Sequence, residues 1–96
     1  MTQSTDPQTA AAGALPRSAG FRGRVRSGQR LIGTFVKTPH PAVVEVLGHS
    51  PLDCLCLDAE HAPFDRGDLD VALLAARAAD LPTLVRVPHA DPAQIL

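Results

Sequence analysis

The stretch Asp53-Cys54-Leu55-Cys56-Leu57-Asp58-Ala59-Glu60-His61-Ala62-Pro63 decides how this chain of 96 residues folds. Its first part is apolar without a regular polar alternation, which predicts a strand at 53–57 that is buried on both faces. Two carboxylates and a histidine follow at once. A charged group at the end of a buried strand is costly to place there without a partner. The stretch therefore predicts a buried strand that ends at the rim of a functional site.

The sequence on either side repeats this unit. Short apolar runs predict two more strands, near 31–36 and 82–86. Capping residues, prolines and glycines then mark the intervening helices. The predicted helices cover 21–27, 41–47 and 65–79, with a further helix start at 91–94. Buried strands that alternate with helices build a parallel α/β sheet, either doubly wound or closed into a (β/α)₈ barrel.

Composition excludes several classes of function. The chain is 45% hydrophobic and 20% charged with a net charge of −1, which is typical of a small globular domain and not of a nucleic-acid binder. No apolar run approaches the ~20 residues that cross a membrane, and residues 1–14 lack the core of a secretory signal. We therefore expect a cytoplasmic protein with a disordered lead at 1–18 and one domain at 19–96. Cys54 and Cys56 are expected to be reduced and to point to opposite faces of their strand.

The predicted strands bring titratable residues to one edge of the sheet. Ligands of parallel α/β folds bind at the carboxyl ends of the strands. The residues expected there are Thr34, Phe35 and Lys37 after the first strand, Asp58, Glu60 and His61 after the second, and Arg86 at the end of the third. Their convergence from three separate segments is a stronger indication of a site than any one residue.

Each of these residues has a functional and a structural interpretation. His61 is suited to proton transfer near neutral pH, or it bonds a loop carbonyl. Arg86 is suited to holding a substrate carboxylate, or it pairs with an acid of the stretch. Asp58 and Glu60 either face a metal and its waters or stabilise the loop. Lys37 is expected to be an exposed lysine rather than a Schiff-base former.

Five segments in this order and spacing resemble the HpcH/HpaI aldolase family, the metal-dependent class II pyruvate aldolases. They are Gly33-Thr34-Phe35, Pro41-Ala42-Val43-Val44-Glu45, Leu57-Asp58-Ala59-Glu60-His61-Ala62-Pro63, Val85-Arg86-Val87-Pro88 and Asp91-Pro92-Ala93-Gln94-Ile95. The resemblance covers roughly residues 21–96. It implies the N-terminal part of a (β/α)₈ (TIM) barrel, with the first helix covering the bottom of the barrel.

The resemblance also implies a reaction and roles. The family cleaves 4-hydroxy-2-oxo acids, as 4-hydroxy-2-oxoheptanedioate aldolase does, to pyruvate and an aldehyde, an activity linked to the catabolism of aromatic compounds. By resemblance, His61 is the acid/base and Arg86 binds the pyruvate part and stabilises the enolate oxygen. Phe35 is a substrate-binding residue, and Glu60 and Asp58 lie near metal-bound water. The implied cofactor is Mg²⁺ or Mn²⁺, with Co²⁺ as an alternative, and the implied assembly is a homo-oligomer.

The family pattern continues past Leu96. Its two direct metal ligands and the aspartate that pairs with the histidine are expected beyond this residue. We therefore expect no metal ligand in this chain, and we expect the chain to be inactive alone. Two alternatives stay open: a non-catalytic binding module that uses the same surface, and a related (β/α)₈ lyase that acts on acyl thioesters.

Overall fold

The computed structural model describes residues 16–92, which alternate between helix and strand. The elements are α2 (Phe21–Arg26), β1 (Gly33–Val36), α3 (Pro41–Gly48), β2 (Cys54–Asp58), α4 (Arg66–Ala78) and β3 (Thr83–Arg86). The predicted strands and helices are confirmed in number and order over these residues, with ends that differ by one or two positions. The predicted helix start at 91–94 lies mostly outside the described residues.

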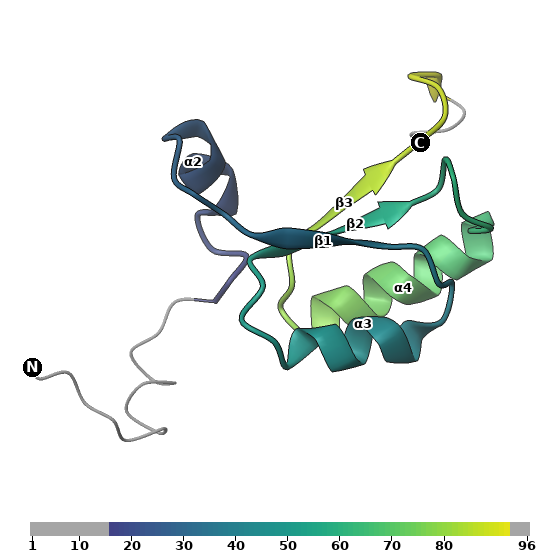
Figure 1. The fold of residues 1–96 in the computed structure, drawn as a ribbon, viewed down its shortest axis with the longest axis horizontal. Helices are drawn as coiled ribbons and strands as arrows, with labels where there is room; N and C mark the ends of the chain where they lie inside the picture. Colours follow the sequence, from purple (N-terminus) through teal and green to yellow (C-terminus); the bar gives the residue numbers. More distant parts are fainter. Residues whose placement is uncertain (1–15, 93–96) are drawn as a thin grey trace, which may run out of the picture.

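The three strands form one parallel sheet in the order β1-β2-β3. Val36 of β1 lies beside Leu57 of β2, and Asp58 lies beside Arg86 of β3. All three strands run in one direction, so their carboxyl ends share one edge of the sheet, while α2 lies near the opposite end (Figure 1). The sheet therefore gathers the residues that follow β1, β2 and β3, as the sequence predicts.

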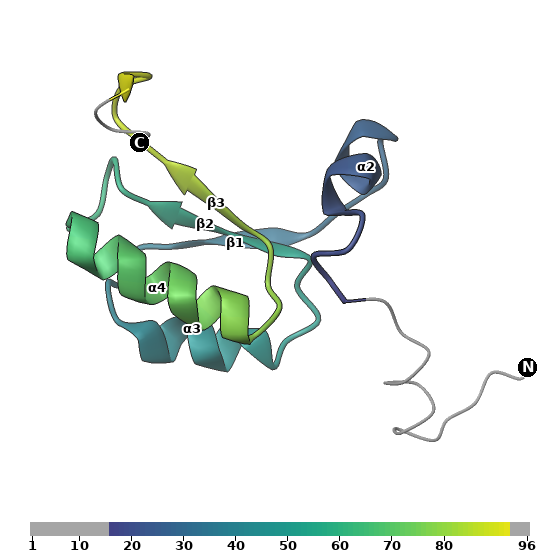
Figure 2. The same ribbon diagram turned by 180° about the vertical axis from the view of Figure 1, so that it is seen from behind.

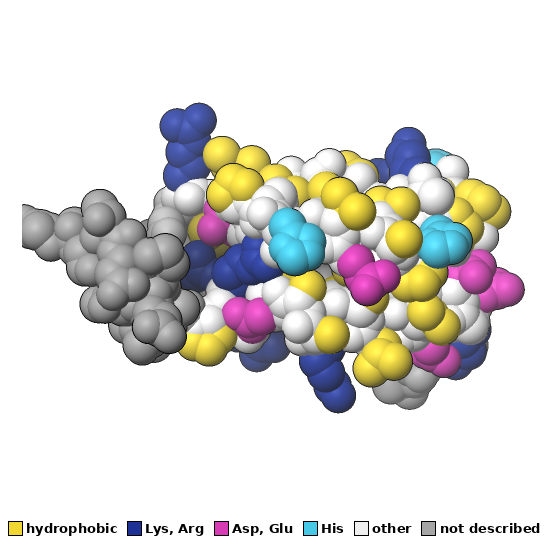
Figure 3. All heavy atoms as spheres, turned by 90° about the horizontal axis from the view of Figure 1, so that it is seen from below, with side chains coloured by type: hydrophobic (Ala, Val, Ile, Leu, Met, Phe, Trp, Pro, Cys, Tyr) yellow, Lys and Arg dark blue, Asp and Glu magenta, His cyan; other side chains and the backbone are white. Residues whose placement is uncertain are grey.

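Both long helices cover the same face of the sheet. Figures 1 and 2 show α3 and α4 side by side on one side of the strands. The core between the two layers is small and apolar, and consists of Val36, Val44, Leu55, Leu57, Ala72, Ala76 and Leu81. Seen from the helix side, hydrophobic side chains alternate with charged ones and histidines (Figure 3). The core is thus built from one face of the sheet only.

The other face of the sheet is open among the described residues. Phe35 and Leu84 point to it, and they are 53% and 54% exposed. The prediction that the strands are buried on both faces is therefore wrong for residues 16–92, because no described element covers this side. We call it the open face, and it consists of Gly33, Phe35, Cys54, Cys56 and Leu84.

The two cysteines correct a second expectation. Both are half-buried, whereas Leu55 between them and Leu57 after them are fully buried. Residues two apart on a strand share a face, so Cys54 and Cys56 point to the same side and not to opposite sides. Gly33 lies directly against Cys54: a Cβ at Gly33 would approach the Cys54 sulfur to 2.6 Å.

Local sequence signals set the starts of α3 and α4. Asp65 accepts a hydrogen bond from the Asp68 amide at 2.7 Å, and the Asp68 carboxylate accepts one from the Asp65 amide at 3.1 Å. This reciprocal capping satisfies two backbone donors at the start of α4. Pro41 occupies the first turn of α3, and His40 Nδ1 accepts a bond from the Ala42 amide. His40 therefore acts as the N-terminal cap of α3.

Arg17 ties the segment before α2 to the ends of α3 and α4. Its guanidinium donates to five carbonyl oxygens at 2.7–3.2 Å, those of Gly48, Ser50, Leu52, Ala79 and Asp80. The Asp80 carboxylate in turn accepts bonds from the Arg17 amide and from Ser18. The predicted disordered lead thus ends too late, because Arg17 and Ser18 are held in place. No helix within residues 16–92 is long and apolar enough to span a membrane.

Candidate functional site at the carboxyl ends of the strands

An ion pair between neighbouring strands forms the centre of the site. Asp58, the last residue of β2, lies beside Arg86, the last residue of β3. Arg86 Nη2 donates to Asp58 Oδ2 at 2.7 Å, and Arg86 Nε donates to Oδ1 at 3.2 Å. Two parallel bonds from a planar guanidinium fix both distance and orientation. The strand register therefore sets the position of the arginine head group.

Asp58 is fully buried, and its hydrogen bonds favour the ionised carboxylate. The hydrogen bonds from Arg86, followed by amide bonds from His61 and Glu60, hold the pKa of Asp58 well below its usual range. Burial removes the carboxylate from water and so raises its pKa; this effect is smaller than that of the Arg86 hydrogen bonds but larger than that of either amide bond. The same partnership raises the pKa of Arg86 above its ordinary value.

The Asp58 carboxylate also shapes the turn that follows β2. Its Oδ1 accepts hydrogen bonds from the backbone amides of Glu60 at 3.0 Å and His61 at 2.9 Å. The Ala59 amide meanwhile donates to the Arg86 carbonyl at 2.9 Å. An aspartate that binds amides two and three residues on holds a turn in one conformation. Asp58 thus positions both Arg86 and the backbone that carries His61.

Glu60 connects the histidine to the arginine. Its Oε1 lies 3.3 Å from His61 Nε2 and 3.6 Å from Arg86 Nε. The His61 side chain is 60% exposed, whereas that of Glu60 is 33% exposed. Since Nε2 faces a carboxylate, Nδ1 is the ring nitrogen left for an incoming group. The imidazole therefore points to solvent and is oriented from one side.

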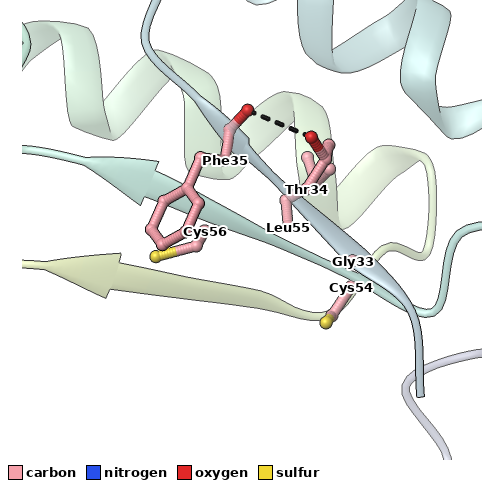
Figure 4. A pocket seen from close by; sticks show the side chains of 6 residues that line it. All are labelled: Gly33, Thr34, Phe35, Cys54, Leu55 and Cys56. Atoms are coloured by element: carbon pink, nitrogen blue, oxygen red, sulfur yellow. Dashed lines mark hydrogen bonds between the residues drawn. The ribbon is translucent and has the colours of Figure 1, made fainter.

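Residues of β1 complete the rim. The Arg86 guanidinium lies over the Phe35 ring at 4.7 Å from its centroid, within the range of a cation–π contact. Lys37 directly follows β1, and its Nζ is 4.0 Å from Asp58 Oδ2. Phe35 also lines a shallow pocket of about 150 Å³ on the open face. Figure 4 shows its ring beside Cys56 there, with Cys54 farther along the same strand.

No family model matches the chain, but curated proteins and solved structures do. The chain is 38% identical over 72 residues to a 5-keto-4-deoxy-D-glucarate aldolase of Klebsiella pneumoniae, covering 75% of this chain. It is 36% identical over 73 residues to a hydroxypyruvate/pyruvate aldolase of Paraburkholderia phytofirmans, covering 74% of this chain. A crystal structure of an HpcH/HpaI aldolase/citrate lyase family protein from Burkholderia cenocepacia superposes with a TM-score of 0.72 at 35% identity, over 79% of this chain.

The chain belongs to the HpcH/HpaI aldolase family. It spans 28% of the length of each of the two aldolases and 31% of the crystallised protein. The predicted fold class is confirmed, because the parallel sheet with its two helices corresponds to part of the (β/α)₈ barrel of this family. The two similar curated proteins are both aldolases.

The residues of this family member do not form a metal site within the described part. No group of three or more His, Cys, Asp or Glu side chains in residues 16–92 is placed to hold a metal ion. Both Asp58 oxygens already accept hydrogen bonds from Arg86. Glu60 alone offers too few oxygens for a hard divalent cation. The described residues therefore do not fit a metal by themselves, and no chemical step is derived through one.

The structure brings together most of the residues that the sequence selected. Asp58, Glu60, His61, Arg86 and Phe35 form one connected group. Thr34 does not join it, since the Thr34 hydroxyl donates to the Phe35 carbonyl away from the rim. His40 is a helix cap, and His49 and His89 are exposed.

Two features of the site were not predicted. One is the double role of Asp58, which holds Arg86 and the turn at once. The spacing in the sequence could have indicated this role. Asp58 lies two residues before Glu60 and three before His61, which is the spacing at which an aspartate accepts hydrogen bonds from both amides. The other is the approach of Lys37 to Asp58: the sequence placed Lys37 at this end of the sheet but gave it no partner, and the strand register brings the two together.

Proposed function

We propose that this segment forms part of the active site of an aldolase that cleaves a 4-hydroxy-2-oxo acid to pyruvate and an aldehyde. The observation that carries the proposal is the connected group at the strand ends, in which a fixed guanidinium lies beside an exposed, oriented histidine. Both chemical tasks of the cleavage, proton removal and stabilisation of a negative oxygen, have a matching side chain there. The family relationship supports the same class of reaction.

In this proposal His61 acts on the substrate hydroxyl. Its Nδ1 takes the proton of the C4 hydroxyl while Nε2 faces Glu60 Oε1. The C3–C4 bond then breaks, the aldehyde leaves, and the bonding electron pair forms the enolate of pyruvate. A proton returned to C3 completes the products. Imidazole suits this exchange because its ordinary pKa is close to neutral pH.

Arg86 carries the charge that develops on the C2 oxygen of the substrate. Asp58 neutralises the guanidinium on one edge, and Phe35 supports its face. The remaining edge, at Nη1, has no hydrogen-bond acceptor among the described residues. In this proposal it faces the 2-oxo acid. A donor that is already fixed needs no reorganisation when the charge appears, which is why such groups lower the barrier.

The cofactor, the assembly and the location of the proposed aldolase belong to the same proposal. A divalent cation such as Mg²⁺, Mn²⁺ or Co²⁺ would supply further positive charge at the enolate oxygen, with ligands from outside the described residues. In this proposal Glu60 would contact water bound to the ion rather than the ion itself. We further propose a cytoplasmic homo-oligomer, and we propose that this chain alone is inactive.

A chimera tests the proposal directly. The matching segment of the Klebsiella pneumoniae aldolase is replaced by that of this chain, and pyruvate release is followed with a coupled dehydrogenase. We expect activity in the chimera. His61→Ala should lower kcat by about 10²–10⁴-fold, and Arg86→Met by about 10²–10³-fold. His49→Ala is the matched control, because His49 is exposed and lies outside the site.

Two results would contradict the proposal. One is a folded chimera, verified by circular dichroism, that releases no pyruvate. The other is a chimera whose His61→Ala and Arg86→Met variants turn over as fast as the parent. The second result would favour a non-catalytic role for the rim.

A further inference from the structure

Lys37 extends the charged row at the carboxyl ends of the strands. It is the only lysine in the chain, beside eight arginines. Val36 pairs with Leu57 in the sheet, so the next position of β1 falls beside Asp58, which itself pairs with Arg86. The result is a row of alternating charge across three adjacent segments: Lys37, Asp58 and Arg86.

The two cations of the row differ in how firmly they are held. Arg86 donates two hydrogen bonds to Asp58, at 2.7 and 3.2 Å. Lys37 Nζ is 4.0 Å from Asp58 Oδ2, too far for a hydrogen bond, and its side chain is 61% exposed. No described residue accepts a hydrogen bond from the Lys37 ammonium. Three donors are therefore available at little cost to the fold.

The row itself has two basic side chains and one acidic side chain. The Asp58 carboxylate is buried and lies between Lys37 and Arg86. Glu60, a second acid close by, contacts Arg86 and His61. Lys37 and Arg86 both approach the same oxygen of Asp58, so one small carboxylate can reach both. An anion that arrives at this edge meets the loose ammonium and the unoccupied edge of the guanidinium together.

We propose that Lys37 is a substrate-positioning residue that binds a carboxylate of the 2-oxo acid while Arg86 binds the neighbouring oxygen. This inference rests on the function proposed above and assigns a second anion-binding group to the same site. Lys37 transfers no proton and forms no covalent bond. Its contribution is to the affinity for the acid and to the orientation of the acid against His61.

The single lysine makes the inference directly measurable. Reductive methylation with ¹³C-formaldehyde labels Lys37 and the N-terminal amine of the native chain and no other group. Pyruvate is then titrated at constant ionic strength against sodium chloride as reference. We expect a saturable shift of the Lys37 signal with pyruvate and none with chloride. Equal shifts with both salts, or no saturable shift, would overturn the inference.

Variants separate a specific contact from general charge. The affinity for pyruvate is measured from the amide NMR signals of residues 58–61 in the chain without methylation. We expect Lys37→Met to weaken binding about tenfold, as for loss of one charge-assisted hydrogen bond, and Lys37→Arg to keep most of the affinity. Arg22→Gln is the charge-matched control, since Arg22 lies exposed on α2. Equal weakening by Arg22→Gln would show a nonspecific charge effect and overturn the inference.

The chimera distinguishes this inference from the proposed function. In an active chimera, Lys37→Met is expected to raise KM about tenfold and to change kcat little, with recovery by Lys37→Arg. An active chimera with unchanged KM would reject the role of Lys37 alone. A folded but inactive chimera that still binds pyruvate specifically at Lys37 would reject the aldolase reaction but support the anion-binding role of Lys37.

Discussion

The one-sided core makes a quantitative prediction about two leucines of the sheet. Leu57 is fully buried against the helix layer, whereas Leu84 on the adjacent strand is 54% exposed on the open face. Leu→Ala removes the equivalent of three methylene groups, worth about 2.4 kcal/mol when all are buried at ~0.8 kcal/mol each. The cavity left in a packed core adds to this loss. We expect Leu57→Ala to lower the free energy of unfolding by about 3 kcal/mol.

The same substitution at Leu84 is the internal control. About half of its surface is already in water and no enclosed cavity results, so we expect a loss of roughly 1 kcal/mol. Urea unfolding of the chain, followed by far-ultraviolet circular dichroism, measures both values. Equal losses, or a larger loss at Leu84, would refute the assignment of the core to one face. Such a result would mean that the open face is covered in solution.

Three further predictions concern single positions. The depressed pKa of Asp58 means that its contribution to stability is present above about pH 4, the ordinary carboxylate range, and is lost as pH falls through the depressed folded-state pKa. Acid unfolding of Asp58→Asn, followed by circular dichroism, should depend less on pH than that of the parent, and equal profiles would argue against the pair. Arg17→Gln should lower the unfolding free energy by about 2 kcal/mol and speed tryptic cleavage in α2 through loss of five carbonyl bonds, whereas Arg22→Gln leaves stability unchanged. Gly33→Ala should destabilise the sheet by about 1–3 kcal/mol in urea, because the new Cβ meets Cys54, while a similar loss for Gly23→Ala, which meets open space, would point to a general glycine effect.

The order of elements could be predicted because local signals agree with the packing. The short apolar run before Asp58 favours a buried strand. Asp65 and Asp68 cap each other's backbone amides and so start α4. The parallel arrangement followed from the alternation of strand and helix. The convergence of Asp58 and Arg86 then followed from topology, because parallel strands end at the same edge.

Other features depend on information that no local pattern carries. Arg17 lies in a small, polar segment, and its carbonyl partners are 31 to 63 residues away in sequence. The exposure of Phe35 and Leu84 depends on which elements cover the second face of the sheet, which an apolar run does not specify. For Arg86, the sequence left a substrate role and an ion pair with Asp58 as alternatives. The structure shows the ion pair. Nη1 has no acceptor among residues 16–92, so the substrate role stays compatible with the ion pair.

The most direct test of the central claim is pyruvate release by the chimeric aldolase that carries this segment, compared with its His61→Ala and Arg86→Met variants. The account predicts an active parent and losses of at least about a hundredfold in kcat in both variants, with His49→Ala unchanged. Variants that fold and release pyruvate at the parental rate would contradict the assignment of the strand-end group as an aldolase site.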